Sequence, residues 1–104
     1  MRYTISQHPL VESDLFEITD MISNYAGLAV GSAKTDEITN FIDALVDFPK
    51  IGTARDELYP GLRAIPASEK AVVCFVVDDN TRIIHVICIS YAGSDWMSRI
   101  RDRL

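Results

Sequence analysis

The chain has 104 residues, of which 48% are hydrophobic, and its 15 acidic and 10 basic side chains give a formal net charge of −5. This length and composition predict one folded domain over residues 1–104 and exclude a disordered chain. The sequence shows no leader and no apolar run of about 18 residues, so we expect a cytoplasmic protein without a membrane segment.

The acidic residues are concentrated in the first half of the chain. Residues 1–50 carry eight acidic and three basic side chains, whereas residues 51–104 carry seven of each. A broad nucleic-acid-binding surface needs clustered Lys and Arg, so we expect no direct, sequence-specific contact with nucleic acid. Only the C-terminus is locally basic, at Arg99, Arg101 and Arg103.

The first half predicts a strand and two helices. Residues 2–7 favour a short strand, and Pro9 is expected at the first helical position. Two apolar stripes at helical spacing follow, formed by Val11, Leu15, Ile18, Ile22 and Tyr25, and by Ile38, Phe41, Ile42, Leu45 and Phe48. The acidic side chains between them, Asp14 included, are expected on solvated faces. Gly27 ends the first helix and the second covers about residues 29–48, so the two should form an antiparallel hairpin.

The second half predicts a β-sheet. Apolar, strand-like runs at residues 62–66, 71–77 and 82–91 are separated by short turns. Such runs indicate a three-stranded antiparallel meander, which the N-terminal strand is expected to join. The predicted fold class is therefore α+β, ending in a short C-terminal helix or tail.

Both faces of the predicted sheet are apolar. In the last strand, alternation places Ile83, His85, Ile87 and Ile89 on one face and Ile84, Val86 and Cys88 on the other. A helix hairpin covers only one face, so the C-terminal segment or another protein must cover the second. After a helix cap at Ser94 or Asp95, Trp96, Ile100 and Leu104 follow at steps of four. This stripe either docks on the sheet or belongs to a mobile segment that grips a target.

Few residues suggest chemistry. Arg63 lies in the middle of a strand, where it is either a cation for a target or the partner of Asp56 or Glu57. His85 alternates with isoleucines, which favours a half-buried structural histidine. No Ser/His/Asp order and no glycine-rich phosphate loop is present, so the sequence predicts no catalytic residues.

Both cysteines lie inside apolar runs. We therefore interpret Cys74 and Cys88 as small buried hydrophobic residues rather than redox groups. Together with His8 and His85 they lack the spacing of a zinc site. We expect neither a metal nor a cofactor.

Residues 49–63 read P-x-x-G-x-x-R-D-E-L-x-P-G-L-R. This motif resembles the ParE branch of the RelE/ParE toxin superfamily, and weaker matches at residues 6–15 and 95–96 extend the resemblance over nearly the whole chain. The resemblance implies the toxin of a bacterial type II toxin–antitoxin system, which inhibits DNA gyrase by binding and forms a hetero-oligomer with a cognate antitoxin. The implied target-binding residues are Arg63, Trp96, Arg99, Arg101 and Arg103. The expected antitoxin-binding residues are Ile84, Val86, Cys88 and Tyr91.

Two alternatives remain open. The first is a RelE-like, ribosome-dependent mRNA endoribonuclease centred on Arg63. Val76 stands where an arginine is common in that superfamily, and Gly93-Ser94 stands where a basic pair is common. These departures and the negative net charge favour a binding toxin over the nuclease. The second alternative is a non-toxic assembly module that keeps the fold only for its antitoxin interface.

Overall fold

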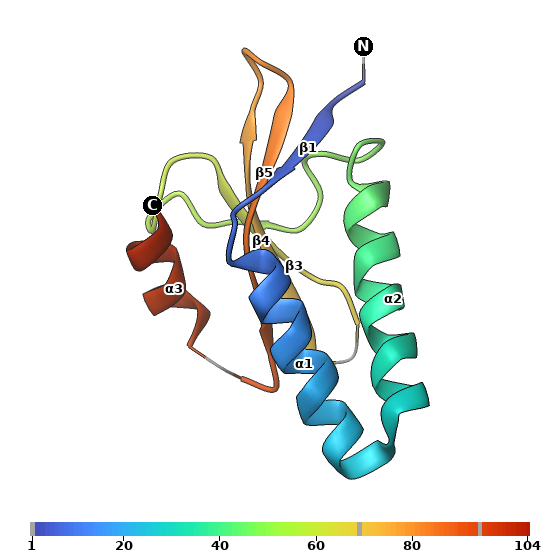
Figure 1. Cartoon of the computed structure of the whole chain (residues 1–104). Coiled ribbons are helices and arrows are strands. Elements are labelled where there is room, and N and C mark those ends of the chain that lie inside the picture. The colour runs from blue at the N-terminus through green and yellow to red at the C-terminus, as the bar shows by residue number, and fades with distance from the viewer. Residues whose placement is uncertain (1, 69, 94) are drawn as a thin grey trace.

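The computed structural model describes residues 2–68, 70–93 and 95–104 and has an α+β fold (Figure 1). The elements in chain order are β1 (Thr4–Gln7), α1 (Val11–Ala26), α2 (Leu28–Ala44), β2 (Thr53–Ala54), β3 (Leu62–Pro66), β4 (Ala71–Asp78), β5 (Ile83–Tyr91) and α3 (Trp96–Arg103). The predicted strand, helix hairpin, meander and C-terminal helix are confirmed. Within the described residues, no helix is long and apolar enough to cross a membrane.

The five strands form one sheet in the order β1-β5-β4-β3-β2. Strands β3, β4 and β5 make the predicted antiparallel meander, and β1 joins it parallel to β5, with Thr4 opposite Ile83. Strand β2 was not predicted. It has two residues, Thr53 and Ala54, which pair with Ala64 and Arg63 at the sheet edge. So short a strand offers little backbone for another chain to pair with.

The helix hairpin depends on two glycines. Gly27 ends α1 with φ +95°, a conformation that L side chains rarely adopt, and the chain turns directly into α2. Gly31 lets the helices approach closely, because an added Cβ would lie 2.4 Å from Ser23 Oγ and 2.8 Å from the Thr19 carbonyl oxygen. Helix α1 begins at Val11 and not at Pro9, and α2 ends before the predicted position near residue 48.

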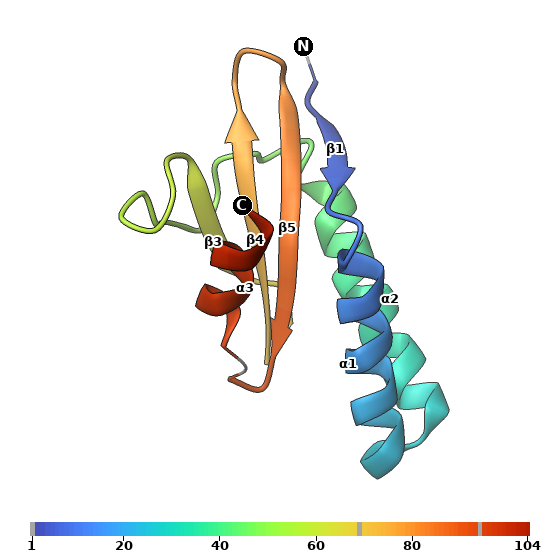
Figure 2. The same cartoon turned by 60° about the vertical axis from the view of Figure 1, so that its left-hand side comes forward.

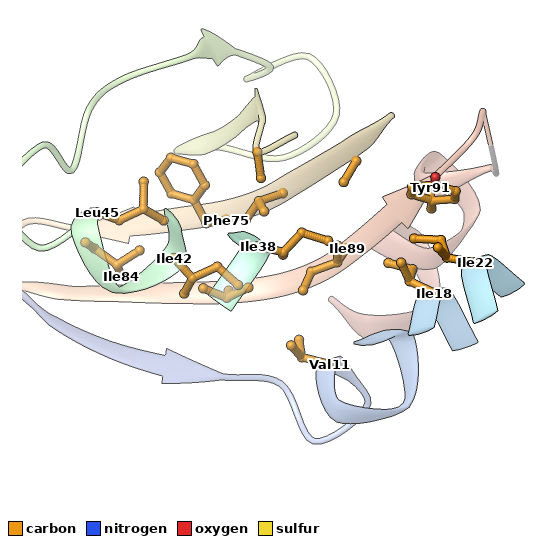
Figure 3. Packing of buried hydrophobic residues seen from close by; sticks show 14 residues of the cluster. Val11, Ile18, Ile22, Ile38, Ile42, Leu45, Phe75, Ile84, Ile89 and Tyr91 are labelled. Atoms are coloured by element: carbon orange, nitrogen blue, oxygen red, sulfur yellow. The ribbon is translucent and has the colours of Figure 1, made fainter. Parts of the chain in front are cut away.

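The main core lies between the hairpin and one face of the sheet (Figure 3). Its largest fully buried side chains include Ile22, Ile38, Ile42, Leu45, Phe75, Ile84 and Ile89. The prediction that Tyr25 and Phe48 belong to this core is wrong, since they are 66% and 62% exposed. Tyr25 lies in the last turn of α1, where its hydroxyl reaches that of Tyr91 at 3.1 Å, and Phe48 lies beyond the end of α2.

A β-bulge interrupts the β4–β5 ladder. Cys74 pairs with Cys88, but the next residue of β4, Phe75, pairs with Val86. Ile87 is therefore an extra residue in β5. Such an insertion shifts the alternation of the strand by one position, so residues on either side of it no longer follow one period.

The bulge changes which residues of β5 share a face. Ile84, Val86 and Ile89 pack in the core under the hairpin, whereas Ile87 and Cys88 pack in a second apolar cluster under α3. The predicted grouping of Cys88 with Ile84 and Val86 is therefore wrong. Figure 2 shows the hairpin and α3 on opposite sides of the sheet, so both faces are covered by this chain.

Candidate functional site

Helix α3 begins at a side-chain cap and packs on the sheet through one buried side chain. Asp95 Oδ1 accepts the Ser98 backbone N–H at 3.2 Å, and Oδ2 accepts the Ser98 hydroxyl at 2.6 Å. These two bonds hold the pKa of Asp95 below its ordinary value. Ile100 is buried against the sheet. Of the two predicted caps, Asp95 is confirmed, and Ser94 lies outside the described residues.

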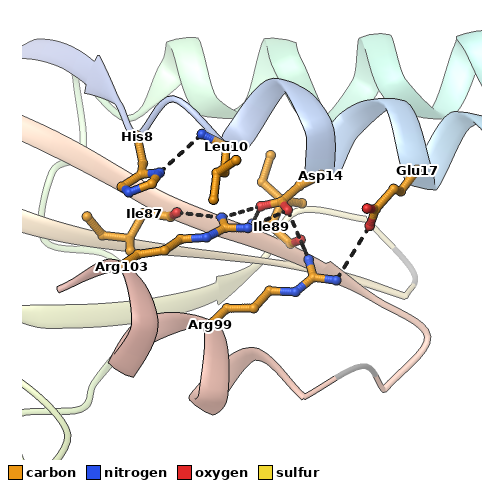
Figure 4. Close-up of polar contacts among 8 residues, drawn as sticks. All are labelled: His8, Leu10, Asp14, Glu17, Ile87, Ile89, Arg99 and Arg103. Carbon is orange, nitrogen blue, oxygen red and sulfur yellow. Dashed lines mark hydrogen bonds and ion pairs between the residues drawn. The ribbon is translucent and has the colours of Figure 1, made fainter.

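Asp14 on α1 joins α3 to the rest of the molecule (Figure 4). Its carboxylate accepts the Ile89 N–H at 3.0 Å, Arg99 at 3.1 Å, and Arg103 at 2.6 and 2.8 Å. The prediction that Asp14 is solvated is wrong, because its side chain is only 3% exposed. Two guanidinium groups and an amide compensate for the water that the carboxylate loses. We call Asp14, Arg99 and Arg103 the Asp14 cluster.

The arginines of the Asp14 cluster also bind the backbone of β5. Arg99 donates to the Ile89 carbonyl at 3.1 Å, and Arg103 donates to the Ile87 carbonyl at 2.9 Å. The hydrogen bonds that Arg103 donates to Asp14 raise the pKa of Arg103, which stays charged in its largely buried position. Both arginines therefore fix α3 to the sheet. Of the three arginines in α3, Arg101 is the one on the exposed surface.

Arg63 is placed away from α3 and bonds its own loop. Its Nε donates to the Ile51 carbonyl at 3.0 Å, and its Nη2 donates to the Gly52 carbonyl at 3.3 Å. The alternative partners considered from the sequence are engaged elsewhere, Asp56 with the Gly61 amide and Glu57 with Arg55. Arg63 thus holds the linker between α2 and β2 against the sheet edge.

Trp96 links α3 to the R-D-E-L segment, residues 55–58. The indole is partly buried against the apolar cluster under α3, and the Arg55 guanidinium lies 5.0 Å from the ring centroid. Arg55 also pairs with Glu57 at 2.5 Å. The sequence did not predict Arg55 as a site residue, although Arg55 is the arginine of the R-D-E-L segment.

A groove separates α3 from the loop that precedes β3. It has a volume of about 410 Å³ and is lined by Glu57, Leu58, Met97, Ile100 and Arg101. Leu58 and Met97 are both exposed large apolar side chains. The groove therefore combines apolar walls with one cation and one carboxylate, a composition that suits contact with another protein.

The four residues expected to bind the antitoxin are all buried. Ile84, Val86 and Tyr91 face the hairpin, and Cys88 lies under α3. Ile84 and Val86 are covered by the hairpin and Cys88 by α3, so these three present no surface to a partner, whereas Tyr91 lines a small cavity at the tip of the hairpin.

The cysteines and His85, the remaining candidates for chemistry, are buried or half-buried within the sheet. Cys74 and Cys88 are free and buried opposite each other, and the thiol hydrogen bond to Cys88 together with burial raises the pKa of Cys74. Cys74 therefore stays protonated and is a poor nucleophile. His85 is half-buried on β5. The described residues contain no group of three or more His, Cys, Asp or Glu side chains that could hold a metal ion.

Comparison with known families assigns the chain. The model of the ParE toxin of the type II toxin–antitoxin system parDE matches residues 5–96. The chain belongs to the ParE toxin family. No curated protein sequence matches it.

Solved structures share the fold of this ParE-family chain. It resembles the chromosomal ParDE system of P. aeruginosa with a TM-score of 0.73 and 17% identity, over 88% of this chain and 97% of the other. The free E. coli toxin RelE, as an arginine mutant, matches with a TM-score of 0.69 and 14% identity, over 100% and 99%. The RelBE2 toxin–antitoxin complex of Mycobacterium tuberculosis matches with a TM-score of 0.60 and 14% identity, over 88% of this chain and 100% of the other.

The family match ends at Trp96. It therefore includes the linker motif and Arg63, whereas Arg99, Arg101 and Arg103 lie beyond it. Identities of 14% to 17% show the fold alone. The roles of the α3 arginines in this ParE-family chain follow from the contacts described above.

Proposed function

We propose that this ParE-family chain is a toxin that inhibits DNA gyrase by binding, without catalysis, and that a cognate antitoxin neutralises it. The observation that carries the proposal is the engagement of its arginines. Arg63, Arg99 and Arg103 each donate to backbone carbonyls or to Asp14 inside the molecule. The groove beside α3 stays open to a protein surface.

The same observation weighs against RNA cleavage. Cleaving a phosphodiester needs a general base, a general acid and cations for the developing charge, all within reach of one phosphate. Arg63 lies on β3 and bonds the linker, while Arg99 and Arg103 bond β5 and α1. Using these arginines on a phosphate would first require breaking the bonds that dock α3 and the linker.

The proposed contact surface is the outer side of α3 with the rim of the groove. Arg101, Met97 and Leu58 are exposed there, and Trp96 is partly exposed beside them. Arg99 and Arg103 are positioning residues in this proposal, because they hold α3 at the angle that presents Arg101. Interfaces typically derive most of their affinity from a few such apolar and arginine anchors.

The test is induced expression in a bacterial host, with separate measurement of labelled thymidine and labelled methionine incorporation. Wild type should reduce DNA synthesis first, with mRNA intact. The double variant Met97→Asp, Arg101→Glu should restore growth at equal soluble expression. Arg82→Glu, an exposed arginine in the β4–β5 turn, is the matched control and should remain toxic.

Two outcomes would overturn the proposal. Early arrest of translation with cut mRNA would assign the chain to ribosome-dependent cleavage. Normal growth with folded, soluble wild-type protein would favour the alternative that the chain is a non-toxic assembly module. In vitro supercoiling by purified gyrase with added toxin separates direct inhibition from an indirect loss of DNA synthesis.

A further inference from the structure

The tip of the helix hairpin forms a small cavity against the end of β5. Its volume is about 140 Å³, and its walls include Ile22 and Tyr25 of α1, Val30 of α2, and Tyr91 of β5. Figure 3 shows Ile22 of α1 close to Tyr91 at this end of the core. Small-molecule sites usually measure about 300–1,000 Å³, so this cavity is suited to a single side chain rather than to a whole ligand.

The rim of the cavity is apolar and exposed. Tyr25, which lines the cavity, is 66% exposed although it is a large apolar side chain. Val30 is also open to solvent. Exposed apolar side chains that gather at a concave site mark an interface more often than scattered ones do. The hairpin tip is therefore a candidate docking surface for a protein segment.

The charge of the cavity is opposite to that of the helices around it. The hairpin has one basic residue, Lys34, among seven acidic ones. The whole chain contains three lysines, and two of them, Lys34 and Lys70, line this cavity from α2 and from the turn before β4. The third, Lys50, pairs with Asp79 at 2.8 Å at the other end of the sheet.

The two cavity lysines have charge available for a partner. Lys34 lies 3.6 Å from Glu37, a long, solvent-exposed pair of the kind that contributes little. Lys70 has no ion pair with any described residue. In addition, the first turn of α2 contains no acidic residue, so the positive end of its dipole beside Val30 is not compensated there.

We propose that this cavity binds one apolar side chain of an acidic peptide segment, and that Lys34 and Lys70 bind the carboxylates that flank it. The proposal rests on the proposed function in one respect, since it assigns the segment to the antitoxin. An acidic partner would be repelled by much of this acidic chain, whereas this cavity joins apolar walls to Lys34, whose pair with Glu37 is solvent-exposed, and to Lys70, which has no ion pair with a described residue. Charge would then fix where the segment docks, and the buried side chain would supply the affinity.

Phe16 provides the matched comparison. It is 72% exposed on α1, but its neighbours are Glu12 and Glu17. An acidic segment should avoid this surface although it is equally apolar. Phe16→Ser therefore removes a large exposed apolar side chain without touching the proposed site.

The test uses a displayed library of random 12-residue peptides, selected on the purified full chain. Enriched peptides should carry an apolar residue within two positions of Asp or Glu. Fluorescence anisotropy should show binding at least about tenfold weaker for Lys34→Glu, Lys70→Glu than for wild type, and weakened also by Val30→Trp, which fills the mouth. Phe16→Ser and Lys50→Glu should change the Kd less than about twofold, and affinity should fall as salt rises.

Three results would overturn the proposal. The first is enrichment of basic or neutral peptides, and the second is equal binding to the Lys34→Glu, Lys70→Glu variant. The third is a wild-type dimer, detected by analytical ultracentrifugation, that the same variant dissociates. That result would mean that a second copy of this chain occupies the cavity. Because no host cell is involved, the result is independent of whether the chain inhibits gyrase.

Discussion

The two faces of the sheet are covered by different kinds of contact. The hairpin face buries a continuous set of isoleucines, valines and leucines from both helices and from the strands β4 and β5. The α3 face buries a smaller cluster, to which the helix contributes the buried side chain of Ile100, and adds the polar Asp14 cluster. Apolar burial is non-directional, whereas the Asp14 cluster needs defined geometry and charge.

Because of this difference, a substitution on one face should change the stability of that face with little effect on the other. Loss of apolar contacts under the hairpin removes the core of the domain. Loss of the Asp14 cluster releases an eight-residue helix whose isolated length is too short for stability in water. The orientation of α3, and with it the proposed gyrase-binding surface, therefore depends on a few polar atoms, while the fold depends on the other face.

Replacing Asp14 with Asn should have the largest effect. Arg99 and Arg103 would lose the buried carboxylate that they share, and we expect a loss of about 1.5–3 kcal/mol of unfolding free energy, the range for hydrogen bonds to charged groups. Amide hydrogen exchange should increase most in α3 and only slightly in β4. Urea unfolding gives the total change in stability.

Glu17→Gln is the control for this prediction. Glu17 pairs with Arg99 at 3.6 Å, but its side chain is 64% exposed, so its removal should cost less than about 1 kcal/mol. If Asp14→Asn accelerated exchange equally in α3 and in the β4 core, the separation of the two faces would be refuted.

Replacing Gly31 with Ala tests the opposite face by steric means alone. The added methyl would lie 2.4 Å from Ser23 Oγ and 2.8 Å from the Thr19 carbonyl oxygen, which is backbone and cannot rotate away. Overpacking of this kind costs about 1–3 kcal/mol, and the higher helix propensity of Ala returns up to about 1. We expect a net loss of about 1–2 kcal/mol by the same balance.

Thermal melting and hydrogen exchange check the Gly31 prediction. Exchange should accelerate in α1 and α2 together and leave the ratio of α3 to β5 protection unchanged. Ser32→Ala, at the next and exposed position, should melt like wild type. A Gly31→Ala protein as stable as wild type would mean that the helices can separate without losing core contacts.

The sequence predicted the hairpin face better than the α3 face, for a physical reason. Periodicity reports repeated apolar positions, and these identify Ile18, Ile22, Ile38 and Ile42 as core. The same rule failed at the β5 bulge, because the inserted residue, Ile87, shifts the alternation by one position. An isoleucine inside an apolar strand gives no signal in the sequence that a bulge is present.

The Asp14 cluster could not be predicted because its members are far apart in the chain. An acidic residue on a helix is usually solvated, and nothing near Asp14 in sequence signals that Arg99 and Arg103 neutralise it. The linker motif identified the family but gave roles to arginines that bond internally in this chain. The motif also contains Arg55, whose guanidinium lies over the Trp96 ring. These two residues are far apart in the sequence and meet only in the folded structure.

The cap of α3 should make the stability of its first turn weakly dependent on pH. The side-chain and backbone bonds from Ser98 hold the pKa of Asp95 below its unfolded value. A carboxylate with a lowered folded pKa stabilises the folded state above the unfolded pKa, and that stabilisation is lost as pH falls through the folded value. The protection factors of the amides in the first turn of α3, which correct for the intrinsic pH dependence of exchange, should therefore fall on acidification before those of the β4 core. Asp95→Asn keeps an oxygen acceptor for the Ser98 amide but cannot titrate, so this variant should show a flat profile, and an unchanged slope would assign the acid response to another carboxylate.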